Sequence, residues 1–180
     1  MFARMRSAAI ALIATTPAAA EVISSTPTGF QVSRTITVTA SPAEAYAALV
    51  RVGDWWNGEH TYSGKAANLS IDARPGGCFC ETLPNGGGVE HGRILYADPG
   101  KVLRFSGSLG PLQGDAIAGT MTWAISAEGG ATKIKQTYVA GGYTGTGFQK
   151  LAPLVDQVLS EQVDRLKTHL DAGGGARRRP

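Results

Sequence analysis

Three polar side chains lie among apolar or aromatic residues and could do chemistry. His60 comes shortly after a tryptophan pair, Glu81 ends a Cys-Phe-Cys-Glu segment, and His91 follows Val-Glu. A carboxylate or an imidazole works as a general acid or base near neutral pH when a dry pocket shifts its pKa. If Phe79 points into such a pocket, so does Glu81, because residues two apart in a strand share a face. Glu81, with His60 as its partner from the loop, is therefore the candidate catalytic pair if the protein is an enzyme.

The same residues are compatible with other roles. His, Cys and Glu side chains are zinc ligands, but the spacings here match no compact zinc motif, and we expect no metal site. Glu81 and His91 could be hydrogen-bonded sheet residues, and Glu81 and His60 could only orient a ligand or stabilise the fold. The strand register that decides which side chains meet is not fixed by the Pro-Asn-Gly-rich turn between the two strands.

Cys78 and Cys80 are the two cysteines of the chain. Residues two apart in a strand have Cα atoms about 6.5 Å apart, near the upper limit for a disulfide. We therefore expect two free thiols, an unusual state for a protein in an oxidising compartment.

The N-terminus has the layout of a secretory signal peptide. Arg4 and Arg6 precede a short apolar stretch, and the small residues that follow suggest cleavage after Ala20. This predicts a signal peptide over 1–20, a periplasmic or secreted protein, and no stable membrane insertion after cleavage. A linker would cover 21–29, one domain 30–172, and a disordered Gly/Arg tail 173–180.

Charge argues against a nucleic-acid partner. The formal net charge is +3 over 180 residues, from 17 Lys and Arg against 14 Asp and Glu. Five of the arginines lie in the leader and the tail, which leaves 12 basic residues in the body. No Lys- or Arg-rich stretch appears between residues 21 and 172, so the folded body lacks the basic footprint of a nucleic-acid-binding domain.

The body of the chain predicts an α+β domain. Alternating apolar and polar residues and turn signals predict about seven antiparallel strands, at 30–39, 68–74, 77–83, 89–97, 101–107, 117–127 and 131–139. Ser41, Pro42 and Glu44 form a capping-box pattern for a helix to about Val50, and a further short helical turn would carry Trp55 and Trp56. From Phe148 to about Ala172 an apolar stripe with helical period predicts one long amphipathic helix.

This order of elements resembles the helix-grip (START-like) superfamily of lipid-transfer proteins, polyketide cyclases and activators of the ninety-kilodalton heat-shock ATPase. The resemblance covers about residues 30–172. It rests on the Ser-Pro-Ala-Glu entry to the first helix, the tryptophan pair, Pro75-Gly76-Gly77, Asp98-Pro99-Gly100 and the terminal helix. It implies a curved sheet wrapped on the long helix over an apolar cavity, but it implies little about activity, because one fold hosts many functions.

A cavity between sheet and helix would be lined by apolar side chains with a few polar groups. Trp56 would stand at the entrance, and the Gly-rich loop 109–115 could either gate the mouth, with Gln113 meeting a polar end of the ligand, or simply cap the core. The candidate ligand-binding residues are Trp56, His60, Phe79, Glu81, His91, Leu112, Gln113, Trp123, Leu154 and Val158.

The function expected first is binding or transport of a hydrophobic or aromatic small molecule, without a cofactor. The first alternative is a cyclase- or hydrolase-type acid–base enzyme that uses Glu81 and His60. The second is a protein-interaction module like the heat-shock ATPase activators, which export would disfavour because that partner is cytosolic. The sequence leaves the oligomeric state and the identity of the ligand open.

Overall fold

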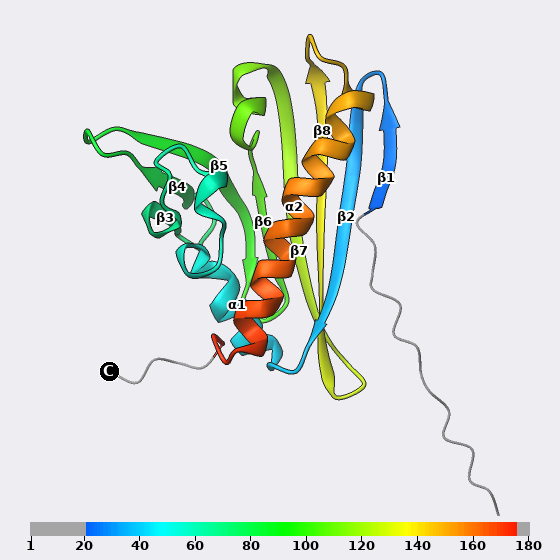
Figure 1. Ribbon diagram of the computed structural model, residues 1–180. Helices are drawn as coiled ribbons and strands as arrows, with labels where there is room; N and C mark the ends of the chain where they lie inside the picture. Colours follow the sequence, from blue (N-terminus) through cyan, green and yellow to red (C-terminus); the bar gives the residue numbers. More distant parts are fainter. Residues whose placement is uncertain (1–20, 176–180) are drawn as a thin grey trace, which may run out of the picture.

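The computed structural model describes residues 21–175 and has an α+β architecture, with one open antiparallel sheet and one long helix across its face (Figure 1). The eight strands lie in the order β1-β2-β8-β7-β6-β5-β4-β3. In chain order the elements are β1 (Glu21–Thr26), β2 (Gly29–Val38), α1 (Pro42–Val50), the 3-10 turns η1 (Val52–Asp54), η2 (Gly58–His60) and η3 (Ala66–Asn68), β3 (Leu69–Ile71), β4 (Cys78–Thr82), β5 (Gly88–Asp98), β6 (Val102–Ser106), η4 (Gly110–Gly114), β7 (Ala116–Glu128), β8 (Ala131–Tyr143) and α2 (Phe148–Asp171).

The first helix, α1, begins as the sequence predicts. The Ser41 hydroxyl accepts a hydrogen bond from the Glu44 amide, the Glu44 carboxylate accepts one from the Ser41 amide at 2.9 Å, and Pro42 occupies the first turn. These bonds satisfy amides that a helix start leaves without partners. The second short helix differs from the expectation: η1 ends at Asp54, before the tryptophan pair, and two more 3-10 turns follow.

The strand β1 corrects the expectation of a linker over residues 21–29. All six of its side chains are exposed, and it pairs along the edge of β2. Its ladder consists of backbone hydrogen bonds, which need no alternation of apolar and polar residues. The sequence therefore carried no periodic signal for it. The described sheet has eight strands, where about seven were expected.

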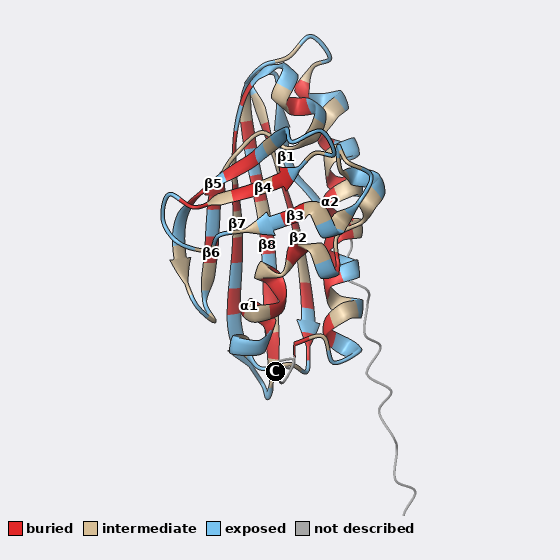
Figure 2. Cartoon of the chain, turned by 90° about the vertical axis from the view of Figure 1, so that its left-hand side faces the viewer, coloured by how far each residue is buried: buried red, intermediate tan, exposed pale blue. Residues whose placement is uncertain are grey.

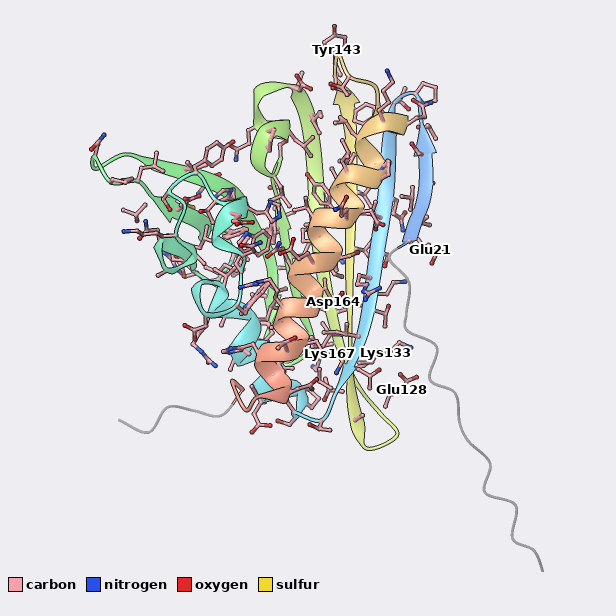
Figure 3. The ribbon with its side chains drawn as sticks, viewed as in Figure 1. Glu21, Glu128, Lys133, Tyr143, Asp164 and Lys167 are labelled. Atoms are coloured by element: carbon pink, nitrogen blue, oxygen red, sulfur yellow. A yellow bond between two sulfur atoms is a disulfide. The ribbon has the colours of Figure 1, made fainter. Side chains whose placement is uncertain are left out.

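The long helix α2 lies against β2 and β1, and the residues after it contact α1. Arg34 on β2 binds Asp164 on α2, with 2.8 Å between the guanidinium Nη2 and Oδ1; Figure 3 labels Asp164 on the helix. The expected tail over 173–180 is also corrected in part. Residues 173–175 form turns, and the Gly174 carbonyl accepts a hydrogen bond from Arg51 Nη2 at 2.5 Å. Residues 176–180, like the expected signal peptide over 1–20, lie outside the described residues.

Buried and exposed positions alternate along the long strands, as a sheet covered on one face requires (Figure 2). Two bulges interrupt the ladders of β5, one against β4 and one against β6. A bulge increases the local twist and re-aims a side chain. Here the bulges lie at the β3–β5 end of the sheet, where the side chains of the candidate site are found. No helix among residues 21–175 is long and apolar enough to cross a membrane.

Candidate ligand-binding cavity

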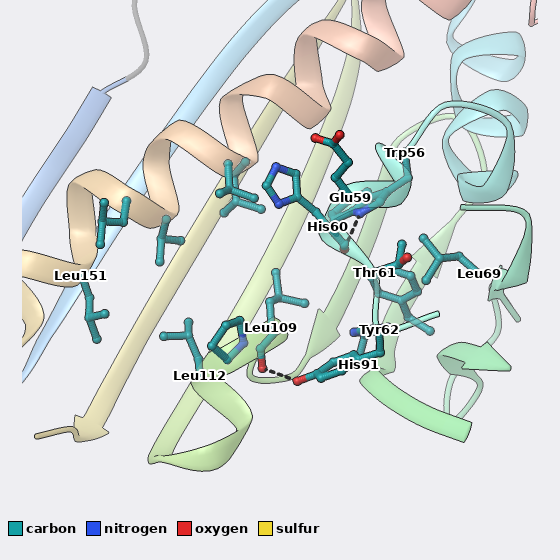
Figure 4. A pocket seen from close by; sticks show the side chains of 17 residues that line it. Trp56, Glu59, His60, Thr61, Tyr62, Leu69, His91, Leu109, Leu112 and Leu151 are labelled. Atoms are coloured by element: carbon teal, nitrogen blue, oxygen red, sulfur yellow. Dashed lines mark hydrogen bonds between the residues drawn. The ribbon is translucent and has the colours of Figure 1, made fainter. Parts of the chain in front are cut away.

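A cavity of about 510 Å³ lies between the N-terminal half of α2, the η4 loop and the β3–β5 end of the sheet (Figure 4). Its lining is mainly apolar and aromatic. The lining residues are Trp56, Glu59, His60, Thr61, Tyr62, Leu69, Phe79, His91, Leu109, Gly110, Pro111, Leu112, Leu151, Leu154, Val155, Val158 and Leu159. A concave site of this size with few polar groups is the usual form of a small-molecule site.

The helix α2 supplies one wall of the cavity through a single stripe of apolar residues. They follow the i, i+3, i+4, i+7, i+8 pattern of one helix face: Leu151, Leu154, Val155, Val158 and Leu159. Leu154 is 59% exposed, so part of this wall is open to solvent.

The segment from Trp56 to Ser63 forms the opposite wall and is tied to α2 and to η4. The Asn57 amide N–H donates to Gln162 Oε1 on α2 at 2.8 Å, and Asn57 Nδ2 donates to Glu161 at 2.6 Å. At the other end of the segment the Tyr62 hydroxyl donates to the Gly110 carbonyl of η4 at 2.9 Å. These bonds hold the wall, the helix and the loop around one opening.

Glu81 and His91 form a buried pair behind this wall. His91 Nε2 lies 2.9 Å from Glu81 Oε2, and Glu81 is 2% exposed. The Glu81 carboxylate also accepts hydrogen bonds from the amides of Tyr62, at 3.1 Å, and Ser63, at 2.5 Å. His91 lines the cavity, whereas Glu81 does not. The carboxylate therefore orients an imidazole that faces the cavity.

A bulge in β5 aims His91 inward. In the β4–β5 ladder Phe79 pairs with Gly92 and Cys80 pairs with Glu90, so His91 is the extra residue. As a result, His91 and Gly92 are consecutive residues that are both buried. Gly92 is required there, because a Cβ atom would lie 2.5 Å from a ring carbon of Phe105.

The pKa of Glu81 lies below its usual value of 4.5. Burial by itself raises this pKa, but hydrogen bonds from the hydroxyl and amide of Ser63, from the Tyr62 amide and from His91 outweigh it. Glu81 is therefore a carboxylate at neutral pH. Held in this form, it is suited to positioning a donor N–H and unsuited to acting as a neutral general acid.

His60 is not the partner of Glu81. Its Nε2 lies 3.2 Å from Glu161 Oε2 on α2, at the edge of the cavity, and the imidazole that meets Glu81 is His91. The sequence-based catalytic pair of Glu81 and His60 is thus corrected to two separate carboxylate–imidazole pairs, because the register bulge in β5 places His91 over Glu81.

The structure separates the remaining candidate residues into two groups. Trp56, Phe79, Leu112, Leu154 and Val158 line the cavity with His60 and His91. Gln113 and Trp123 do not line it: Gln113 Nε2 donates to the Glu90 carbonyl at 2.8 Å, and Trp123 is buried in the core against Trp55. Tyr62 was missed, and its sequence context offers no signal beyond being an aromatic residue in a polar loop.

Cys78 and Cys80 form a disulfide, which corrects the expectation of two free thiols. Their Cα atoms are 5.4 Å apart, closer than in a regular extended strand and within the ordinary disulfide range. The ladder shift lies beside Cys80, so the regular spacing on which the expectation rested does not apply. Within residues 21–175 no group of three or more His, Cys, Asp or Glu side chains is placed to hold a metal ion.

No protein-family model matches the sequence, and no curated protein matches it. Solved structures do. MLL2253 from Mesorhizobium loti has a TM-score of 0.56 at 15% identity, over 79% of this chain and 97% of that one. CalU16 from Micromonospora echinospora has a TM-score of 0.54 at 16% identity, over 83% and 78%. DynU16, from the dynemicin biosynthetic locus, has a TM-score of 0.55 at 18% identity, over 79% of this chain and 48% of DynU16. At these identities the likeness shows the fold alone.

Proposed function

We propose that this protein is a helix-grip protein that binds a hydrophobic or aromatic small molecule in the cavity between the sheet and α2. The observation that carries the proposal is the cavity of about 510 Å³, lined by leucines, valines and aromatic rings. Covering this apolar lining with an apolar ligand removes its surface from water, which favours binding by about 25 cal/mol for each Å² buried. The loop η4 and the Trp56–Ser63 segment form the opening through which a ligand would pass.

Native mass spectrometry before and after organic extraction tests this function. The full chain is expressed with its own leader and recovered from the periplasm. An additional extractable mass, bound one to one, is the expected result. An apo mass in every preparation, together with no binding of the fluorescent hydrophobic probe 1-methylpyrene, would contradict the proposal.

The same spectrum tests where the protein resides. The N-terminal sequence supports export with cleavage after Ala20. The expected mass is that of a chain beginning at Glu21, found in the periplasmic or secreted fraction. An uncleaved chain in the cytosol would overturn this part of the proposal and leave the binding function standing.

A second candidate function is acid–base catalysis, with His91 in place of His60. The observation that favours it is the 2.9 Å contact between the Glu81 carboxylate and an imidazole that faces the cavity. In this reaction His91 Nδ1 takes a proton from water as the water adds to an ester carbonyl, and returns it to the alcohol or aryl oxygen as the acyl C–O bond breaks. Hydrolysis of 2-naphthyl acetate at a rate that falls about 100-fold or more in His91→Phe, with folding intact, would support the enzyme. Equal rates in both proteins would exclude His91 as a base for this ester.

A further inference from the structure

We infer that His91 is the polar anchor of the cavity, and that the ligand presents to it a hydroxyl group that donates a hydrogen bond to Nδ1. This inference rests on the proposed binding function and names the class of ligand: a hydrophobic molecule with a phenolic or alcoholic hydroxyl at one end.

The Glu81 carboxylate determines which nitrogen of His91 is free for a ligand. Glu81 is ionised and only accepts hydrogen bonds, so the contact at 2.9 Å places a proton on Nε2 of His91. The inferred ligand contact uses the neutral imidazole, the form in which the other nitrogen, Nδ1, carries a lone pair. It forms no hydrogen bond with any residue between 21 and 175. A ligand hydroxyl is the complementary group.

Two aromatic rings hold the imidazole in place. Tyr62 stacks on it, with ring centroids 6.0 Å apart and 28° between the planes, and the Phe79 centroid lies at 5.0 Å. With Nε2 committed to Glu81 and two rings against it, the imidazole cannot turn without breaking the buried pair. Because Nδ1 is held in one orientation, it selects a ligand by the direction from which its hydroxyl approaches as well as by the presence of that hydroxyl.

The other polar side chains of the lining are already engaged or exposed. His60 pairs with Glu161, the Thr61 hydroxyl donates to the Gly58 carbonyl, the Tyr62 hydroxyl donates to the Gly110 carbonyl, and Glu59 is exposed. His91 therefore offers the buried acceptor of an otherwise apolar site. The apolar lining disfavours a charged ligand, because burying an unpaired charge is costly.

Two fluorescent probes of nearly equal shape test the inference: 1-hydroxypyrene and 1-methylpyrene. Dissociation constants are measured for the wild-type protein, for His91→Phe and for Gln157→Phe, a control at an exposed position of α2 outside the cavity lining. One hydrogen bond between neutral groups corresponds to a factor of about 3–10 in affinity. The preference for the hydroxyl probe, taken as the ratio of the two constants, should fall by that factor in His91→Phe and persist in Gln157→Phe. 1-Methylpyrene should still bind to both variants.

The possible outcomes separate this inference from the proposed function. If neither probe binds the wild-type protein, the binding function fails and the anchor fails with it. If both bind and the ratio is the same in wild type and His91→Phe, the anchor alone is overturned. Should His91→Phe not fold, ¹⁵N NMR of the wild-type imidazole decides: 1-hydroxypyrene should move the Nδ1 resonance and 1-methylpyrene should not. Equal shifts with the two probes would contradict the anchor.

Discussion

The two halves of α2 carry the same apolar stripe but meet different surroundings. In the C-terminal half Val163, Leu166 and Leu170 are buried, with Leu166 0% exposed. In the N-terminal half Leu151, Leu154 and Val158 line a cavity. The helix and its periodicity are continuous across both, so the difference arises from what lies opposite the helix.

Opposite the packed half are α1 and the residues around it. Arg165 Nε donates to the Trp55 carbonyl at 2.9 Å, and Gly175 lies close to both Leu170 and Glu44. Opposite the hollow half are two loops, the Trp56–Ser63 segment and η4, which contact each other through Tyr62 and Gly110. Loops that are hydrogen-bonded to each other can enclose space without filling it, whereas a helix packed on a helix cannot.

The largest effect that tests this comparison is on stability in the packed half. Leu166→Ala should lower the free energy of unfolding by about 2–5 kcal/mol, because the deleted side chain leaves a void in a close-packed region. Urea unfolding followed by circular dichroism measures it. Leu154→Ala, in the hollow half, is the matched change and should cost under about 1 kcal/mol. Equal losses would show that both halves are packed alike.

The next largest effect is on ligand binding in the hollow half. Val155→Trp places an indole in the cavity and should weaken 1-methylpyrene binding by about 10-fold or more, since the ligand and the new ring compete for the same space. Stability should change little. Gln157→Trp, on the solvent side of the same helix, is the control and should bind as wild type does. Unchanged affinity in Val155→Trp would place the binding site elsewhere.

The packed half could be predicted from sequence better than the hollow half. The capping box at Ser41 and the stripe of α2 are local patterns, and local patterns predict helices directly. The position of His91 depends on a bulge in β5, and which imidazole meets Glu81 depends on strand register, a property of two chain segments together. The sequence predicted that Phe79 and Glu81 share one face of the strand, and both are buried on that face of β4, but it assigned the wrong histidine.

The disulfide and β1 show the same limit. Both depend on backbone geometry that side-chain types do not encode: the contracted spacing between Cys78 and Cys80 beside a ladder shift, and the pairing of six exposed residues with the edge of β2. Seven of the 17 cavity-lining residues were named from the sequence: Trp56, His60, Phe79, His91, Leu112, Leu154 and Val158. Tyr62 could not be, because only tertiary structure brings its loop to η4 and Glu81.

A smaller effect is expected from the disulfide, which lies at the cavity end of the sheet but on the other face of β4 from Phe79 and Glu81. Closing so short a loop removes little freedom from the unfolded chain, so the double change Cys78→Ser and Cys80→Ser should cost about 1–2 kcal/mol. Probe affinity should stay within about two-fold of wild type. A loss of binding far beyond that would mean that the disulfide positions the cavity wall.

The smallest effect, a change in acid sensitivity, compares one carboxylate from each region. Glu81 borders the cavity, and Glu44 lies at the start of α1. Hydrogen bonds lower the pKa of both carboxyls. Those to Glu81 come from Ser63, Tyr62 and His91, and those to Glu44 come from Ser41. A carboxyl whose folded pKa is depressed contributes stability above its unfolded pKa, near 4.5, and loses it as the pH falls through the folded value. Between about pH 6 and pH 3 the Tm of the wild-type protein should therefore decrease by more than the Tm of Glu81→Gln or of Glu44→Gln. Only Glu81→Gln should also reduce the hydroxyl preference at pH 7, since it alone contacts the imidazole that faces the cavity. If Glu44→Gln reduced that preference as much, the two regions would be coupled, and the separation between a packed half and a binding half would fail.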